Sequence, residues 1–165
     1  MSRVFWDTNL FIYLFEDYGP LSEAVGQLRS KMLDRGDQLL TSTLTLGEIL
    51  VKPIERKDAA RCQKYEHTIS TVVVLVPFEV KAAKLYAALR SERSLKAPDA
   101  IQLACAASAS VDLFITNDDR LQGKHVDGIQ FIVPLARVPF EITLKAESTT
   151  GSPVRPHSPG VGRRA

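Results

Sequence analysis

The sequence predicts an α/β domain with a mainly parallel β-sheet of about five strands. Short apolar or β-branched segments alternate along the chain with longer segments that have helical spacing or composition. Such alternation favours parallel strands, because each helix returns the chain to the end of the sheet where the next strand begins. The 165 residues, of which 45% are hydrophobic and 24% charged, are enough for one domain with a buried core.

The N-terminal segment predicts a strand followed by two helices. Residues 3–6 are apolar and short, as in a buried strand. Thr8 and Asn9 are suited to start a helix that covers residues 10–15. A second helix is indicated by apolar residues at helical spacing, namely Leu21, Val25, Leu28 and Met32. Gly36 is placed to close that helix.

The next segment predicts a second strand and two more helices. The strand covers residues 39–42, and the following helix covers residues 44–51. Pro53 is expected to end or kink that helix, because proline cannot donate the helical hydrogen bond. Asp58 is a suitable N-cap for a helix that runs to about residue 68.

The third strand is predicted most clearly, because residues 71–76 are β-branched and apolar. Residues 78–90 are rich in Ala, Leu and Lys and predict a helix, and Pro98 suits the first turn of another helix over residues 99–109. Two further strands are expected over residues 113–116 and 130–133. The expected order is therefore β-α-β-α-β-α-β-α-β.

Two parts of the chain are expected to differ in order. Residues 1–145 form the predicted domain, whereas residues 146–165 are mostly Ser, Thr, Gly, Pro and Arg and predict a flexible tail. The formal net charge of +2 is compatible with a nucleic-acid partner without arguing for one. Two cysteines do not make a disulfide scaffold, and no apolar run approaches the length of a signal peptide or membrane span. A cytoplasmic protein with no membrane partner is expected.

Four acidic residues stand in unusual surroundings. Asp7 and Asp118 directly follow predicted strands, and the carboxyl ends of parallel strands are where α/β proteins bind ligands. Glu48 and Asp99 are each the only charged residue in a long apolar window. A carboxylate among core residues is costly unless a cation or hydrogen-bond donor meets it, and Mg²⁺ or Mn²⁺ prefers such oxygen ligands.

Each acid also has a simpler explanation. Asp7 suits a turn or helix cap, Asp99 suits the first turn of a helix, and Glu48 suits an exposed position on a helix. Asp118 is a natural loop residue, and its neighbour Asp119 is an alternative for the same role. The sequence alone does not show that the strands before Asp7 and Asp118 are neighbours. All four acids in this order are harder to explain by capping alone.

The surroundings of these acids resemble the acidic motifs of the PIN-domain family, and most of all its VapC-type toxin ribonucleases. The resemblance rests on Val4-Phe5-Trp6-Asp7-Thr8-Asn9, Thr45-Leu46-Gly47-Glu48-Ile49, Ala97-Pro98-Asp99-Ala100-Ile101-Gln102-Leu103-Ala104 and Phe114-Ile115-Thr116-Asn117-Asp118. These motifs in this order are specific, although any one alone is not. The match spans residues 4–133.

The resemblance implies a three-layer α/β/α sandwich and a divalent-metal-dependent endoribonuclease that uses Mg²⁺ or Mn²⁺. It implies that Asp7, Glu48, Asp99 and Asp118 are the catalytic, metal-binding acids, supported by hydrogen bonds from the polar residues Asn9 and Thr116. It also implies an RNA substrate, a cognate antitoxin protein and a homodimer. The long polar tail and the extra acid at position 119 depart from the simplest toxin pattern.

Basic residues are candidates for phosphate binding, although a solvated helix surface explains them equally simply. One group follows Glu48 and comprises Lys52, Arg56, Lys57, Arg61 and Lys64. The other precedes Asp99 and comprises Lys81, Lys84, Arg90, Arg93 and Lys96.

Three competing interpretations of the whole chain stay open. They are a nucleic-acid-binding or adaptor domain with little activity, a different metal-dependent phosphoesterase, and a structural protein that binds no metal. Apolar residues 10–15 are expected in the core, although a dimer or antitoxin interface would also use them.

Overall fold

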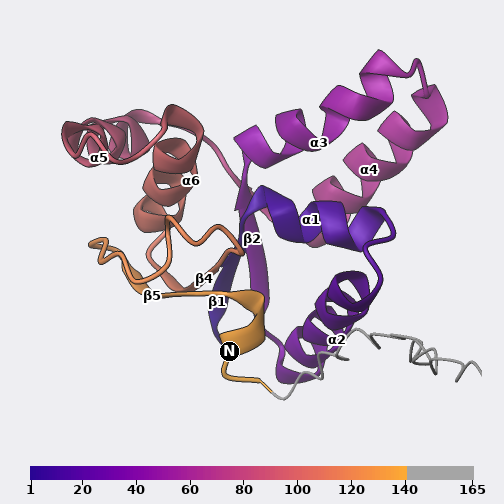
Figure 1. Cartoon of the computed structure of the whole chain (residues 1–165), viewed down its shortest axis with the longest axis horizontal. Helices are drawn as coiled ribbons and strands as arrows, with labels where there is room; N and C mark the ends of the chain where they lie inside the picture. Colours follow the sequence, from indigo (N-terminus) through magenta and orange to yellow (C-terminus); the bar gives the residue numbers. More distant parts are fainter. Residues whose placement is uncertain (141–165) are drawn as a thin grey trace, which may run out of the picture.

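The computed structural model describes residues 1–140, which form one α/β unit (Figure 1). The predicted tail, residues 146–165, lies outside the described residues, as does the end of the predicted domain.

A five-stranded sheet forms the centre of the molecule. Its strands are β1 (Arg3–Trp6), β2 (Gln38–Ser42), β3 (Val74–Val76), β4 (Val111–Ile115) and β5 (Ile129–Val133). They lie in the order β3-β2-β1-β4-β5, and every neighbouring pair is parallel. The predicted parallel α/β class is therefore confirmed.

Helices cover both faces of the sheet and complete a three-layer sandwich. One face is covered by α1 (Thr8–Phe15), α2 (Pro20–Arg35), α3 (Thr43–Glu55) and α4 (Ala59–Val72). The other face is covered by α5 (Val80–Ser91) and α6 (Ala97–Ser108). A short 3₁₀ helix, η1 (Leu135–Arg137), follows β5.

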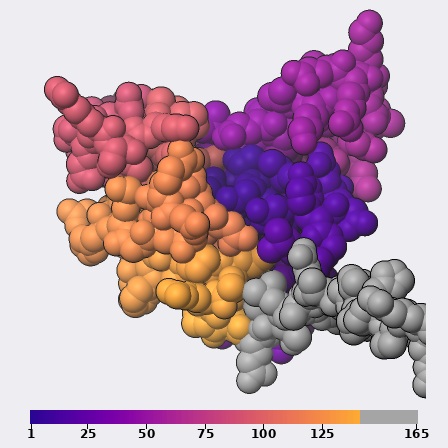
Figure 2. Space-filling model, viewed as in Figure 1, coloured from indigo at the N-terminus to yellow at the C-terminus, as the bar shows by residue number. Residues whose placement is uncertain are grey.

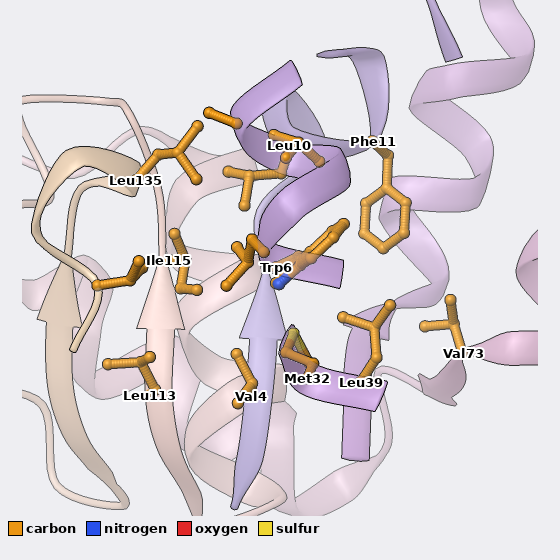
Figure 3. Close-up of a cluster of buried hydrophobic side chains, with 14 of the residues drawn as sticks. Val4, Trp6, Leu10, Phe11, Met32, Leu39, Val73, Leu113, Ile115 and Leu135 are labelled. Atoms are coloured by element: carbon orange, nitrogen blue, oxygen red, sulfur yellow. The ribbon is translucent and has the colours of Figure 1, made fainter. Parts of the chain in front are cut away.

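Alternating side chains of the strands divide the core into two clusters. Val4 and Trp6 of β1 pack with α1 and α2 (Figure 3). Phe5, which lies between them in the strand, packs with α6 on the other face. Leu10 and Phe11 are 0% and 1% exposed in the first cluster, so the core role expected for the start of residues 10–15 is confirmed. Successive residues of one strand thus anchor helices on opposite faces.

Two element boundaries and one expected helix differ clearly from the sequence prediction. Helix α3 continues two residues past Pro53, whose side chain is buried, and packing against α4 offsets the missing hydrogen bond. The third strand begins only at Val74, because the hydrogen-bonded turns of α4 continue through Val72 despite its β-branched residues. No helix lies between β4 and β5, where turns replace the one expected.

The sheet order decides where the predicted acids meet. β1 and β4 are neighbours, with Trp6 in register with Ile115. The pairing extends one step further, because the Asp7 amide donates to the Ile115 carbonyl at 3.0 Å. The strand order reverses between β1 and β4, so the residues that follow both strands lie where open α/β sheets bind ligands.

The surface is hollowed above this edge. Figure 2 shows the hollow between a lobe formed by α5 and α6 and a lobe formed by α3 and α4, with the N-terminal part of the chain, in indigo, at its floor. Among residues 1–140, no helix has the length and apolar character needed to cross a bilayer.

Candidate active site

Asp7 lies at the junction of β1 and α1, where it is the N-cap of the helix. Its Oδ1 accepts a hydrogen bond from the Thr8 amide at 2.8 Å. Its Oδ2 accepts a second one from the Thr116 hydroxyl at 2.7 Å. The carboxylate is therefore fixed by residues that follow two neighbouring strands.

Glu48 projects from the second turn of α3 toward the same edge. Its Oε1 accepts from the Thr8 hydroxyl at 3.2 Å and lies 3.5 Å from Nε2 of Gln102 on α6. Thr8 thus contacts Asp7 through its amide and Glu48 through its hydroxyl. Two of the predicted acids are linked through one residue of α1.

Asp99 and Asp118 share a counterion, Arg120. Nε of Arg120 donates to Asp118 Oδ1 at 2.9 Å, and Nη2 makes a second, very close contact with Asp118 Oδ2. The same Nη2 lies 3.6 Å from Oδ2 of Asp99 in the first turn of α6. The guanidinium therefore bridges the two carboxylates.

The electrostatics of the acids show that all four lie near one another. The pKa of Asp7 is raised to about 6, chiefly by burial, with smaller contributions from Glu48 and Asp99 and against the lowering by the Thr116 and Thr8 hydrogen bonds. Burial also raises the pKa values of Glu48 and Asp99, with Asp99 adding to the shift of Glu48 and Asp118 to that of Asp99. In contrast, the hydrogen bond from Arg120 lowers the pKa of Asp118. Within residues 1–140, Arg120 is the only cation in ion-pair contact with these four acids.

Asn9 and Thr116, the polar residues expected to support the acids, both lie at the cluster. Thr116 donates to Asp7, while its own hydroxyl oxygen accepts from the Asp118 amide at 3.0 Å and from Asn9 Nδ2 at 3.4 Å. Asn9 reaches Asp7 only through Thr116. Its Oδ1 is buried and has no hydrogen-bond partner within the described residues.

The role of Gln102 was not identified from the sequence. Its side chain extends from α6 to Thr8, Thr45 and Glu48 at the acidic cluster. It is 2% exposed, accepts from Ser42 Oγ at 2.7 Å, and donates to the hydroxyls of Thr45 and Thr8 at 2.8 and 3.0 Å. The sequence did contain a signal, because Gln102 is the only uncharged polar residue in the apolar window after Asp99. Arg120 was also missed, and its short distance from Asp118 along the chain was the only hint.

Other candidate residues lie at the rim or away from the cluster. Asp119 is exposed and accepts from Gln122 of its own loop at 2.9 Å, whereas Asp118 faces Asp99 and Arg120. Lys52 of the first basic group lines a small pocket with Glu48, and Lys96 of the second lowers the pKa values of Asp99 and Asp118. Arg56, Arg61 and Lys64 line a separate depression farther along α4.

A model of the PIN domain matches residues 4–125. The chain belongs to the PIN-domain family. No curated protein matches it.

Solved structures of toxin–antitoxin complexes are similar to this PIN domain. A chain of VapBC2 from Rickettsia felis, bound to a promoter DNA fragment, has a TM-score of 0.63 at 15% identity, covering 79% of this chain and 97% of the other. A chain of DNA-bound VapBC from Salmonella typhimurium has a TM-score of 0.60 at 15% identity, covering 82% and 99%. A chain of a Klebsiella pneumoniae toxin–antitoxin complex has a TM-score of 0.55 at 26% identity, covering 78% and 95%.

The donor set of the PIN domain suits a hard divalent cation. It consists of carboxylate oxygens with a hydroxyl and an unpartnered amide oxygen beside them, and no His or Cys joins it within the described residues. Within residues 1–140, however, no three His, Cys, Asp or Glu side chains are arranged so that they form a metal-binding group as they stand. The chemistry of the donor set fits a metal. Its arrangement is not preformed, because Arg120 already pairs with Asp99 and Asp118.

Proposed function

We propose that this PIN domain is a divalent-metal-dependent endoribonuclease and the toxin component of a toxin–antitoxin pair. One observation carries the proposal: in a PIN fold, the carboxyl edge of the parallel sheet brings together two linked pairs of acids, Asp7 with Glu48 through Thr8 and Asp99 with Asp118 through Arg120. Three of these acids have pKa values raised chiefly by burial and to a smaller extent by neighbouring acids, an environment in which a bound cation would favour the charged carboxylates. The family assignment supports hydrolysis of nucleic acid.

Asp7, Glu48, Asp99 and Asp118 would hold Mg²⁺ or Mn²⁺ at this edge. A bound divalent ion supplies a more acidic water as the nucleophile and stabilises the charge on the leaving oxygen of a phosphodiester. The reaction class is hydrolysis in which the P–O bond to the leaving oxygen breaks as water adds to phosphorus.

The neighbouring residues position these acids and their substrate. Thr116 holds Asp7, and Thr8 and Gln102 hold Glu48, so that the carboxylates keep their orientation at the junction of three elements. Lys52 lines a small pocket with Glu48 and also pairs with Glu16 at 3.8 Å, and Lys96 lowers the pKa of Asp99. Both ammonium groups would attract the phosphates of RNA. The hollow between the two lobes in Figure 2 gives an extended strand access to the edge of the sheet.

An antitoxin partner belongs to the same proposal. Similar chains come from structures described as toxin–antitoxin complexes, three of them VapBC assemblies. We propose that this PIN domain likewise binds a cognate antitoxin, forms a homodimer and acts on cytoplasmic RNA. Co-expression with the protein encoded by the adjacent gene, followed by size-exclusion chromatography with light scattering, tests both partners.

Cleavage of a mixed RNA panel by the purified protein tests the activity. The panel is incubated with Mn²⁺ or Mg²⁺, with EDTA, and with Asp7→Asn in place of the wild type. Asp127→Asn is the matched control, because Asp127 has a side chain that is 99% exposed and pairs only with His125 in the described part of the chain. We expect metal-dependent cleavage by the wild type and the control, and none by Asp7→Asn.

Two competing functions predict different results. A nucleic-acid-binding or adaptor domain retains RNA but cleaves none in any metal, and the absence of a preformed metal group in residues 1–140 is the observation that favours it. A different metal-dependent phosphoesterase hydrolyses a monoester or DNA while leaving RNA intact. Calorimetry with Mn²⁺ on the same samples decides the remaining case, because a chain that binds no metal is not the proposed enzyme.

A further inference from the structure

Arg120 is the cation that pairs with the acidic cluster, and its guanidinium is partly exposed to solvent. Its side chain is 53% exposed, and its two partners, Asp118 and Asp99, are 21% and 20% exposed. The loop that carries it is anchored independently, because Leu121 is fully buried and its amide donates to the Asp118 carbonyl at 3.0 Å. Turning the Arg120 side chain would free its guanidinium from the carboxylates without unfolding the loop, because the Arg120 amide stays bonded to Asp118 Oδ1 at 3.0 Å.

The guanidinium and a divalent ion compete for the same oxygens. Nε and Nη2 of Arg120 occupy both carboxylate oxygens of Asp118, and Nη2 also faces Oδ2 of Asp99. A divalent ion held by these two residues needs at least one oxygen from each, and two cations at this spacing repel one another. The guanidinium side of the pair is 53% exposed, so a divalent ion from solvent can reach these oxygens and compete with it.

We propose that Arg120 is an exchangeable counterion of this site, which neutralises Asp99 and Asp118 without metal and contacts a substrate phosphate once metal displaces it. The proposal rests on the proposed function, because it concerns the same metal and the same RNA. A displaced Arg120 remains tethered at the rim of the acidic edge by Leu121. Its planar fork then suits a phosphate, which presents oxygens in the same geometry as a carboxylate.

The first test measures Mn²⁺ binding by calorimetry to wild type, Arg120→Ala, Arg120→Lys and Lys124→Ala. Lys124→Ala is the matched control, because it removes one positive charge from the same loop, where Lys124 Nζ contacts Ser94 Oγ at 3.4 Å. We expect Arg120→Ala to bind Mn²⁺ about threefold to tenfold more tightly than wild type, since the competitor is gone. Arg120→Lys should fall between the two, and Lys124→Ala should match wild type.

The second test measures binding of a short, labelled 2′-O-methyl RNA of mixed sequence by fluorescence anisotropy, with Mn²⁺ and with EDTA. We expect Arg120→Ala to weaken RNA binding about threefold or more in Mn²⁺ and to leave it unchanged in EDTA, where Arg120 of the wild type is engaged by the acids. Arg120→Lys should restore part of the loss. The same substitution thus tightens metal binding and weakens RNA binding, which a merely structural role does not produce.

The outcomes separate this proposal from the one on which it rests. If wild type binds Mn²⁺ and Arg120→Ala binds it equally or more weakly, the exchange is overturned while the nuclease proposal stands. An equal loss of RNA binding in EDTA and in Mn²⁺ also overturns the exchange, because Arg120 would then contact RNA regardless of metal. If wild type binds no Mn²⁺, both proposals fail together.

Discussion

Asp7 combines a structural role with a proposed catalytic one. As the N-cap of α1 it accepts from the Thr8 amide, and as a carboxylate it lies beside Glu48 and Asp99 in a desolvated position. The first role is met equally well by asparagine, which is among the best N-cap residues. The second requires the negative charge. Substitution of Asp7 by asparagine therefore keeps the helix cap and removes only the negative charge.

The raised pKa of Asp7 predicts how stability depends on pH without metal. The folded-state pKa of about 6 lies above the ordinary 3.8, so the folded chain binds more protons than the unfolded chain between these values. The contribution of Asp7 to the free energy of unfolding therefore falls as pH rises from about 4 to about 6, by about 3 kcal/mol in total. In EDTA at about pH 7.5, Asp7→Asn should raise the free energy of unfolding by about 1–2 kcal/mol.

Urea unfolding of both proteins at about pH 4 and pH 7.5 checks this expectation. The two proteins should have similar stability at the lower pH, where Asp7 is protonated in the folded chain and close to half protonated in the unfolded chain, so that little of the pH-dependent difference has developed. Saturating Mn²⁺ at the higher pH should reverse the order, because ligand binding stabilises only the chain that retains its acids. A destabilised Asp7→Asn in EDTA at the higher pH contradicts the argument.

Gln102 is predicted to stabilise the fold through its buried hydrogen bonds, although it is not one of the proposed metal-binding residues. Gln102→Leu keeps the volume but removes the hydrogen bonds that Gln102 makes with Ser42, Thr8 and Thr45. Ser42 Oγ loses its buried acceptor, while the two threonine hydroxyls keep their bonds to one another and to Thr41 and Glu48. Loss of these bonds should lower the free energy of unfolding by about 2–3 kcal/mol. Gln63→Leu on the exposed face of α4 is the control and should change it by less than about 0.5 kcal/mol in the same urea titration.

At the scale of the elements, alanine substitution of two glycines that precede strands is predicted to lower the free energy of unfolding by different amounts. Gly36 ends α2 in the left-handed region, with φ 70°, and an added Cβ would meet nothing within 4 Å. Gly128 precedes β5 with φ 93°, and its Cβ would lie 2.6 Å from the Ala107 carbonyl oxygen at the end of α6. Gly36→Ala should therefore cost about 1 kcal/mol, and Gly128→Ala more than about 2 kcal/mol.

Thermal and urea unfolding of the two alanine variants compares these costs directly. Equal losses would mean that the backbone conformation alone decides them and that β5 shifts away from α6 without penalty. A greater loss for Gly128→Ala would show that the close approach of β5 to α6 is fixed.

Most elements were predictable from the sequence because their signals are local. β1 coincides with residues 3–6, and Gly36 and Asp58 bound their helices as expected. Residues 71–73 were placed in a strand because they are β-branched, but such preferences are weak compared with continuation of a packed helix. The interior position of Pro53 was likewise decided by tertiary packing, which no local pattern records.

The acidic motifs were predictable for a different reason. Asp7 and Asp118 follow strands, so their common location required only that β1 and β4 be neighbours. Arg120 and Gln102 were not found, because their roles depend on contacts across the fold. Gln102 meets residues of β2, α1 and α3 that are far away in the sequence.

At the scale of the whole molecule, the two lobes carry one basic residue each to the edges of the acidic cluster. Lys52 lies on α3 beside Glu48, and Lys96 precedes α6 beside Asp99. Lys31 on α2 lies on a different part of the surface, beside Arg35 and Phe140. An RNA strand that enters the hollow between the lobes is expected to meet the first two lysines but not the third.

Alanine substitution of each lysine tests this arrangement. Lys52→Ala and Lys96→Ala should each weaken RNA binding at all sequences and lower the slope of log affinity against log salt concentration by about 0.7, the value for one phosphate contact on a single strand. Lys31→Ala should change neither quantity. An unchanged slope for both Lys52→Ala and Lys96→Ala would place the RNA outside the hollow.

The sheet order also has a consequence for synthesis on the ribosome. β1 leaves the exit tunnel first but lies at the centre of the sheet, and one of its two partners, β4, ends at Ile115. No pair of consecutive strands among residues 1–140 forms a hairpin, so the nascent chain gains its central pairing only after most of the domain has been translated. Asp118 and Arg120 emerge later still. A growing polypeptide of this kind carries Asp7, Glu48 and Asp99 while it lacks the fourth acid, so the proposed nuclease would gain its full set of acids only when translation of the domain is nearly finished.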